Sequence, residues 1–395
     1  MKITDVRTMR LTGPDPHGVG GVARSWTIEL VRVDTDSGIY GLGESGSFMG
    51  DKEGIAYCRE WLLGKDPLAI GPFVRAMLVG GLPPYDPQMS PTATVTGPIA
   101  WAVSGVEMAL CDLAGKALGT PVYNLLGGRF RDHIRVYLDR SGVEDPTDDA
   151  SWVRLAERVG EEGFTDLKFD AEWIAPELNR DPWNRQMRGD QVQRTVDRLM
   201  LVRETVGPDV EILLDGHFSF DVETAVRLAQ ALEPVGLKWF EDPISIIDVT
   251  GLRRVRDSSP VPICTGEMLI AEQFRAFINA EAIDIVHPDV LFVGGLHEAR
   301  KVADYADLNA IPLALHNNGS GLTSIASAHV AAASPNFIGL EYHFYDAKWI
   351  GQVVRREGHE LFEAGHVLLS DAPGLGIELD EAICRKYLAP GESLF

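Results

Sequence analysis

Three acidic residues recur at equal spacing in the middle of the chain, each at the end of a short apolar run. Asp215, Glu241 and Glu267 are separated by two intervals of 26 residues, the length of one strand, one loop and one helix. Side chains at the carboxyl ends of parallel strands converge on one mouth, where three carboxylates would repel one another unless a hard divalent cation lay between them. The spacing therefore predicts a Mg²⁺ site. The alternative is three unrelated surface acids in a chain with 58 Asp and Glu residues.

From about Arg131 onward, apolar strand-like runs alternate with amphipathic helical segments, which is typical of a parallel sheet. We expect eight strands, at Ile134–Leu138, Thr165–Phe169, Glu211–Leu214, Lys238–Phe240, Val261–Cys264, Ile283–Val286, Ile311–Leu315 and Phe337–Leu340. Eight strands with helices between them close into a barrel, so the pattern predicts an α/β fold, a modified (β/α)8 (TIM-type) barrel over residues 131–351. The segment Ala171–Arg188, with two Trp and two Pro, is expected to be an inserted loop over the mouth.

Residues 1–130 show a different pattern, which predicts an N-terminal α+β capping domain. Antiparallel strands are expected at Ile3–Leu11, Ser25–Thr35 and Gly38–Leu42, and helices at Ile55–Leu63 and Ile99–Ala117. Two Gly-rich stretches, Gly13–Gly21 and Gly43–Gly50, are expected to be loops, and loops of this kind often close over a site. Residues 352–395 show turns and no clear final helix, so we expect them to run back and complete the capping domain.

Charge and composition exclude several classes of protein. The net charge of −22 argues against nucleic-acid or anionic-membrane binding, which need a basic face. Cys58, Cys111, Cys264 and Cys384 are far apart and form no CxxC pair, so neither a disulfide framework nor a zinc knuckle is expected. The chain starts on a strand-like run and has no apolar run of membrane-spanning length, which predicts a cytoplasmic protein.

Reactive side chains follow the second and third expected strands. If Lys168 faces the interior beside the metal, the neighbouring positive charge lowers its pKa towards that of a usable base. The alternative is a lysine neutralised by Asp170 in a salt bridge. His217, two residues after Asp215, should project into the mouth, where a histidine can protonate a leaving hydroxyl. The alternative there is a histidine hydrogen-bonded at the barrel rim.

The last three strands end in a further set. Asp289 follows the sixth strand and His316 the seventh, so neighbouring strands bring them within reach of each other. A carboxylate that holds one imidazole nitrogen fixes the tautomer and raises the basicity of the other nitrogen, as in a catalytic dyad. Glu341 follows the eighth strand, and its carboxyl group, if protonated, can hydrogen-bond a substrate carboxylate. His17 lies in the candidate lid; the other histidines in loops or on helix faces are expected to be structural, namely His133, His297, His329, His359 and His366.

The chain resembles the enolase superfamily, mandelate racemase subgroup, and within it the galactonate dehydratase-like acid-sugar dehydratases. The resemblance covers almost the whole chain: the capping domain, the run Val106–Gly128 at the domain junction, and each strand-end motif. It implies that Asp215, Glu241 and Glu267 bind Mg²⁺. It also implies a small-molecule sugar-acid substrate and an even-numbered homo-oligomer, such as an octamer.

The resemblance further implies a set of catalytic roles. The dyad of His316 and Asp289 takes the proton α to the substrate carboxylate, Glu341 is the electrophilic glutamate, and His217 protonates the departing β-hydroxyl. The product is an enol that tautomerises to a 2-keto-3-deoxy acid, so the implied enzyme is a Mg²⁺-dependent dehydratase of an aldonate such as galactonate, gluconate or mannonate.

Two other hypotheses stay open. The first is racemisation or epimerisation of an α-hydroxy acid, with Lys168 and His316 on opposite faces of one α-carbon. Racemases of the subgroup usually show Lys-x-Lys on the second strand, whereas this chain has Asp170 in place of the second lysine. Lys238 is expected near the metal beside Lys168. The second hypothesis is a non-catalytic sugar-acid binding or regulatory protein on the same scaffold. Specificity is expected to come from the loops at residues 17–25, 44–52 and 171–188.

Overall fold

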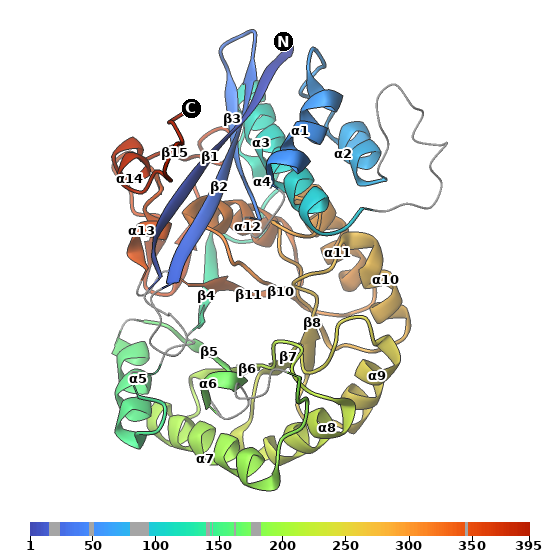
Figure 1. Cartoon of the computed structure of the whole chain (residues 1–395), viewed down its shortest axis with the longest axis vertical. Helices are drawn as coiled ribbons and strands as arrows, with labels where there is room; N and C mark the ends of the chain where they lie inside the picture. Colours follow the sequence, from blue (N-terminus) through green and yellow to red (C-terminus); the bar gives the residue numbers. More distant parts are fainter. Residues whose placement is uncertain are drawn as a thin grey trace.

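The computed structural model describes residues 1–15, 24–46, 51–79, 95–139, 143, 145–161, 163–174, 183–343 and 347–395. Figure 1 shows a closed barrel of strands ringed by helices, with a second module of strands and helices packed beside it at the top of the view. Both chain termini lie at the top of the picture, in the part of the molecule that holds this second module.

The N-terminal module is an antiparallel sheet covered by helices, as expected. Its strands are β1 (Ile3–Asp15), β2 (Arg24–Thr35) and β3 (Tyr40–Ser45), and its helices are α1 (Asp51–Leu62), α2 (Ile70–Leu78), α3 (Pro98–Leu118) and α4 (Val122–Leu125). The strand β1 includes Gly13–Asp15, so the loop predicted to start at Gly13 begins later than expected. The helix α2 was not predicted.

The stretch Gly43–Gly50 was predicted to be a loop, but its first three residues belong to β3. A Cβ atom on Gly43 would lie 2.0 Å from the carbonyl oxygen of Gly105, and one on Gly41 would lie 1.9 Å from that of Ala109. These glycines therefore let β3 touch the backbone of α3 directly, which a sequence pattern cannot distinguish from the glycine of a turn.

Eight parallel strands form a closed barrel, which confirms the predicted (β/α)8 architecture. They are β4 (His133–Asp139), β5 (Asp166–Asp170), β6 (Glu211–Asp215), β7 (Trp239–Glu241), β8 (Ile263–Thr265), β9 (Ile285–Val286), β10 (Leu313–Leu315) and β11 (Phe337–Tyr342). Each strand pairs with the next along the chain, and β11 pairs with β4 to close the ring. The interior below the mouth is a packed layer rather than a pore, made by Tyr137, Leu213, Trp239, Cys264, Ile285 and Ala314.

Helices surround the barrel in Figure 1. They are α5 (Asp149–Glu161), α6 (Ala171–Ile174), α7 (Gly189–Val206), α8 (Val222–Ala231), α9 (Val249–Ser258), α10 (Ala271–Asn279), α11 (Leu296–Leu308) and α12 (Gly321–Ala333), with a short 3-10 helix, η4 (Glu233–Val235). The segment predicted as an inserted loop, Ala171–Arg188, begins with the short helix α6, and its residues 175–182 lie outside the described part of the chain.

The C-terminal segment packs against both modules. It contains α13 (Lys348–Gly351), β12 (Val354–Arg355), β13 (Phe362–Glu363), β14 (His366–Leu368), β15 (Glu378–Leu379) and α14 (Glu381–Lys386), so the expectation of no final helix was wrong. The overlooked signal is Asp380, whose carboxylate caps α14 by accepting the N–H groups of its first turn. β14 pairs with β4 of the barrel, whereas the N–H of Thr12 in β1 donates to the carbonyl of Tyr387 at 2.7 Å.

Across the described residues, no helix combines the length and the apolar character that a membrane crossing requires. All four cysteines are buried and unpaired, in agreement with their spacing in the sequence.

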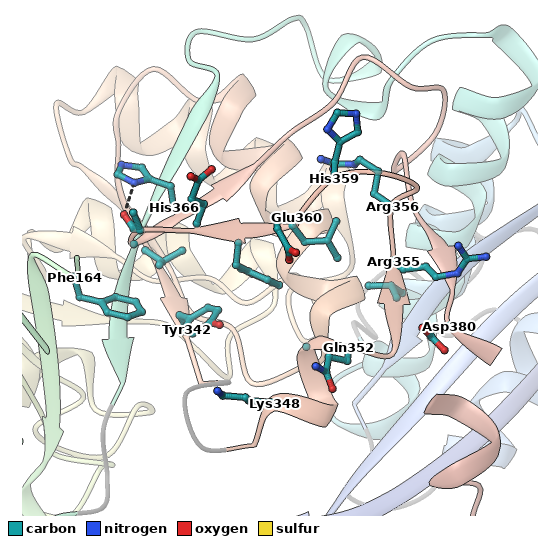
Figure 2. Close-up of a pocket in the computed structure, with 18 of the residues that line it drawn as sticks. Phe164, Tyr342, Lys348, Gln352, Arg355, Arg356, His359, Glu360, His366 and Asp380 are labelled. Atoms are coloured by element: carbon teal, nitrogen blue, oxygen red, sulfur yellow. Dashed lines mark hydrogen bonds between the residues drawn. The ribbon is translucent and has the colours of Figure 1, made fainter. Parts of the chain in front are cut away.

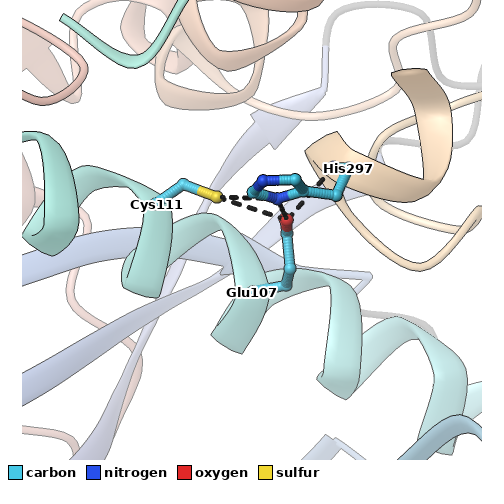
Figure 3. A group of neighbouring side chains, drawn as sticks. All are labelled: Glu107, Cys111 and His297. Carbon is cyan, nitrogen blue, oxygen red and sulfur yellow. Dashed lines mark hydrogen bonds and ion pairs between the residues drawn. The ribbon is translucent and has the colours of Figure 1, made fainter. Parts of the chain in front are cut away.

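A buried glutamate of α3 caps a barrel helix. Glu107 accepts the backbone N–H of Leu296 at 2.6 Å and that of His297 at 3.1 Å, at the start of α11. The Nδ1 atom of His297 and the thiol of Cys111 also contact this carboxylate, at 2.6 Å and 3.2 Å (Figure 3). Burial raises the pKa of the Cys111 thiol well above its usual value, so the thiol stays protonated and acts as a donor. The first-turn N–H groups have no partner inside their own helix, so this group fastens the two modules together.

A second glutamate of the N-terminal module does the same for α12. Glu44, near the end of β3, accepts the backbone N–H of Ser320 at 3.0 Å and its hydroxyl at 2.5 Å, and the hydroxyl of Thr323 at 2.6 Å. Burial raises the pKa of Glu44 to about 7, although these three donors favour the ionised form. Glu44 and Glu107 thus complete the starts of two consecutive barrel helices.

His329 lies where three parts of the chain meet. It sits in α12, it is fully buried, and its Nδ1 accepts the N–H of Tyr123 in α4 at 3.1 Å. Its Nε2 lies 3.3 Å from the carbonyl oxygen of Leu375 in the C-terminal segment. Because Nδ1 accepts, the neutral ring carries its proton on Nε2 and donates it to that carbonyl. Burial lowers the pKa of His329 to about 4.

We predict that His329 makes the fold less stable as the pH falls below about 6.5, the ordinary pKa of an unfolded histidine. Between there and about 4, the unfolded state binds a proton that the folded state does not, so the free energy of unfolding falls. Between pH 7.5 and 5.5, urea unfolding of His329→Gln, which cannot titrate, should lose about 1 kcal/mol less stability than the wild type. Replacement of the exposed His133 by Gln is the control and should follow the wild type. An identical pH dependence in His329→Gln and the wild type would contradict the assignment.

Candidate active site

Every barrel strand places an ionisable side chain near its carboxyl end or just past it. In strand order these are Asp139, Lys168, Asp215, Glu241, Glu267, Asp289, His316 and Glu341. All are buried, with at most 9% of each residue exposed. Six of the eight are acids, so the mouth concentrates buried negative charge that needs nearby positive charge to be tolerated.

Asp215, Glu241 and Glu267 come together as their spacing predicts. Each offers a carboxylate oxygen, and these atoms lie within 4.8 Å of one another. Burial and the neighbouring charge of Glu241 raise the pKa of Asp215 to about 7, which reflects the cost of holding these acids together. Carboxylate oxygens are the ligands that hard divalent cations prefer, so the three residues fit such an ion.

Lys168 is the buried cation among these acids. Its Nζ lies near four carboxylates, those of Glu241 (2.8 Å), Asp215 (3.3 Å), Glu341 (3.3 Å) and Asp139 (3.9 Å). Lys168 thus has four acidic neighbours, whereas the alternative hypothesis gave it a single partner, Asp170. Burial alone would lower the pKa of Lys168, but these carboxylates raise it well above its usual value. The lowered pKa expected for Lys168 from the sequence assumed a metal ion beside it. The side chains alone shift the pKa of Lys168 in the opposite direction, upwards.

Asp289 and His316 lie next to each other, as the strand order predicts. The His316 Nδ1 is 2.6 Å from Asp289 Oδ2, and the N–H of Leu291 donates to the other oxygen at 2.7 Å, which holds the carboxylate in place. Asp289 therefore fixes the ring so that Nε2 faces the mouth, where it lies 2.9 Å from Glu267 Oε2. Burial would lower the pKa of His316, but the adjacent acids, Glu341 first among them, raise it well above its usual value.

His217 lies at the edge of the mouth beside Asp215. Its φ angle of 41° is in the left-handed region, which residues other than glycine rarely adopt. Its backbone N–H donates to Asp215 Oδ1 at 2.7 Å, and its Nε2 is 3.4 Å from Asp215 Oδ2. With 38% of its side chain exposed, the ring is accessible to a ligand that enters the mouth.

Three residues below the mouth support the acids and were not predicted. The Tyr137 hydroxyl donates to Glu341 Oε2 at 2.7 Å, and Trp239 Nε1 donates to Glu241 Oε2 at 2.9 Å. His287 Nε2 lies between the same two acids, 3.2 Å from Glu241 Oε1 and 3.7 Å from Glu341 Oε2. Each stands two residues before a strand-end acid, so the period-two alternation of strands was the signal that could have found it.

The environment of Glu341 differs from the expected one. Burial alone would raise its pKa, but His316, Lys168 and His343 hold it well below the usual value. The ionised form is therefore favoured in this arrangement, and not the protonated form considered from the sequence.

Two further residues of the mouth were missed. Asp139 ends β4 after an apolar run, as the other strand-end acids do, and His343 stands two residues after Glu341. The His343 Nε2 lies 2.6 Å from Glu341 Oε1 and 3.3 Å from Asp139 Oδ2.

Lys238 pairs with Asp166, the first residue of β5, at the amino end of the barrel strands, so the expectation that it lies near the metal was wrong. His17, the candidate lid residue, lies outside the described residues.

A cavity of about 860 Å³ lies away from these residues (Figure 2). Its lining includes Val136 and Tyr342, which alternate along their strands with the inward-facing Tyr137 and Glu341, so the cavity adjoins the outer face of the barrel. Much of the rest of its lining comes from the C-terminal segment. It contains none of the eight strand-end residues and is therefore separate from the candidate active site.

Comparison with known proteins gives matches along the whole chain. Residues 3–127 match the family described as mandelate racemase / muconate lactonizing enzyme, N-terminal domain, and residues 151–383 match the enolase C-terminal domain-like family. A D-xylonate dehydratase of Haloferax volcanii is 36% identical over 397 residues, covering 100% of this chain and 90% of that protein. A D-galactonate dehydratase family member of Musicola paradisiaca is 31% identical over 420 residues, covering 99% and 95%. The crystal structure of a mandelate racemase/muconate lactonizing enzyme-like protein from Rubrobacter xylanophilus is 34% identical, with a TM-score of 0.87 and coverage of 100% and 99%.

We predict that Lys168 offsets the repulsion among the acids when no ion is bound. In the presence of a chelator, Lys168→Met should lower the free energy of unfolding by roughly 3–5 kcal/mol, because it leaves buried carboxylates without their cation. Added Mg²⁺ should stabilise this variant more than the wild type, as measured by the shift in thermal midpoint.

Lys238→Met is the matched control, since Asp166 keeps a second cation in Arg135, whose Nη1 lies 3.4 Å away. The control should show the Mg²⁺ response of the wild type. If Lys168→Met were as stable as the wild type in the chelator, the offsetting role of Lys168 would be refuted.

Proposed function

Because this chain belongs to the mandelate racemase / muconate lactonizing enzyme family, we propose that it is a hydro-lyase that dehydrates a sugar acid with the help of Mg²⁺. Relatives named D-xylonate dehydratase and D-galactonate dehydratase family member align over almost the whole chain and support this reaction class. The observation that carries the proposal is the buried His316–Asp289 pair beside three carboxylates that fit a divalent ion. As substrate we propose an aldonate, such as xylonate, galactonate, gluconate or mannonate.

The difficult step is removal of the proton α to a carboxylate, because the resulting enediolate carries two negative charges. Asp215, Glu241 and Glu267 would hold the Mg²⁺, which when bound stabilises the charge that develops on the substrate carboxylate. Lys168 lies against two of these acids and against Glu341, so it adds a second positive charge close to the same carboxylate.

His316 is the proposed base. Asp289 holds its Nδ1, so Nε2 points into the mouth. Among the side chains alone, Nε2 contacts Glu267 and the surrounding acids raise the pKa of the ring; with these acids engaged on an ion, the neutral Nε2 would take the α-proton of the substrate. Asp289 then stabilises the imidazolium that forms, since its carboxylate is 2.6 Å from the ring nitrogen.

His217 is the proposed acid for the leaving group. Its partly exposed ring at the rim of the mouth can donate a proton to the departing β-hydroxyl, which leaves as water. The α-proton leaves first, and the β-hydroxyl then departs from the neighbouring carbon. The remaining enol takes up a proton at the β-carbon and releases its hydroxyl proton, which gives a 2-keto-3-deoxy acid.

The alternatives make different demands on the same residues. A racemase needs Lys168 as a second base and has no role for His217. The Lys168 ammonium lies among four carboxylates, an environment that favours the protonated ammonium over the neutral amine that a base requires. A non-catalytic sugar-acid binding protein needs no His316–Asp289 pair.

Variants of the two histidines test the proposal. On a panel of aldonates with Mg²⁺, we predict that His217→Asn lowers formation of the 2-keto product by roughly 10²- to 10⁴-fold but still exchanges the α-proton with D₂O, as followed by NMR. His316→Asn should lose both reactions, because it removes the base. His359→Asn, in an exposed residue outside the barrel, is the control and should behave as the wild type.

Three outcomes separate the hypotheses. Full keto-product formation by His217→Asn would exclude its role as the leaving-group acid. Inversion at the α-carbon without water loss in the wild type would support the racemase hypothesis. Failure of the wild type to consume any acid of the panel would support the binding-protein hypothesis.

A further inference from the structure

Three side chains meet at the seam where β11 and β4 close the barrel: Asp139, Glu341 and His343, here called the seam group. The His343 Nε2 lies 2.6 Å from Glu341 Oε1 and 3.3 Å from Asp139 Oδ2, and each residue offers one ligand atom within 4.8 Å of the others. The expected catalytic roles use only Glu341, so Asp139 and His343 have no assigned function.

The seam group has unsatisfied hydrogen-bonding capacity. Within the described part of the chain, Asp139 Oδ1, Glu341 Oε1 and His343 Nε2 are buried atoms with no hydrogen-bond partner. Two of these atoms, His343 Nε2 and Glu341 Oε1, lie 2.6 Å apart and form an ion pair, whereas Asp139 Oδ1 is left without a donor. A buried carboxylate oxygen without a donor is costly and is normally satisfied, so Asp139 Oδ1 beside the His343 ring marks a place for a polar group from outside the chain.

The position of the seam group relates it to the proposed reaction. Lys168 Nζ is 3.3 Å from Glu341 Oε2 and 3.9 Å from Asp139 Oδ2, and it also contacts two of the proposed metal ligands. His343 stands two residues beyond Glu341 along the chain, towards the N-terminal module. Trp26 of β2 lies over it, with ring centroids 5.9 Å apart. A substrate with its carboxylate at Lys168 would therefore extend its carbon chain past Asp139 and His343 towards the N-terminal module.

The charge of the seam group defines the ligand. Two carboxylates repel the acid end of a sugar acid, so a neutral group that donates a hydrogen bond suits them better. A hydroxyl can donate to Asp139 Oδ1, which lacks a donor, and can accept from the neighbouring His343 ring. We propose, on the basis of the proposed function, that Asp139 and His343 bind a hydroxyl of the sugar acid other than the departing one. These two residues then select polyhydroxy acids over simple β-hydroxy acids.

The test compares two kinds of ligand in a background that cannot turn them over. D-xylonate and D-galactonate carry additional hydroxyls, whereas 3-hydroxypropanoate has only the carboxylate and the departing hydroxyl. With Mg²⁺ and His316→Asn as background, calorimetric affinities give the preference for the aldonates over 3-hydroxypropanoate. We expect Asp139→Asn, and separately His343→Gln, to lower this preference by about 10- to 100-fold while leaving 3-hydroxypropanoate binding nearly unchanged.

Asp132→Asn, in a side chain that is 67% exposed, is the control and should leave the preference unaltered. Equal weakening of both kinds of ligand, or no change in either, would overturn the proposal. Loss of one bound divalent ion per chain in Asp139→Asn, with an unchanged preference, would instead make the seam group a cation site. Because binding is measured without turnover, a wild type that dehydrates nothing but keeps the preference would refute the proposed function and not the seam-group proposal.

Discussion

Repulsion among buried carboxylates is the constraint around which this molecule is built. Six of the eight strand-end positions are acids, and a barrel mouth cannot hold them without compensating charge. Lys168 supplies a positive charge next to these acids. Tyr137 and Trp239 donate hydrogen bonds to Glu341 and Glu241, and His287 contacts Glu241. The same concentration of charge that threatens the fold is what suits the mouth to a divalent cation. Stability and chemistry thus make opposite demands on the same residues.

The regular elements and the converging acids could be predicted because they follow from local periodicity. Equal spacing placed Asp215, Glu241 and Glu267 at equivalent points of successive βα units, and the order of neighbouring strands paired Asp289 with His316. The direction of the pKa of Lys168 could not be predicted, because it depends on four carboxylates that come from other strands of the barrel.

Other failures have a similar physical origin. Gly43 lies in a strand, and a glycine is needed there because the backbone of α3 lies directly against it. In the sequence, a glycine required by such a close contact looks the same as a glycine required by a turn. Lys238 looked close to the metal because its strand is adjacent, but it lies at the opposite end of that strand, against Asp166. Asp139 and His343 obey the same rules as the other residues, since Asp139 ends an apolar strand and His343 stands two residues after Glu341.

The caps supplied by Glu44 and Glu107 tie the candidate active site to the N-terminal module. α11 and α12 directly follow the loops that carry Asp289 and His316, and the first turns of both helices are completed by carboxylates from the N-terminal module. Without the N-terminal module, both helix starts beside the Asp289–His316 pair would lack these caps. The placement of the pair thus depends on contacts that an isolated barrel could not supply.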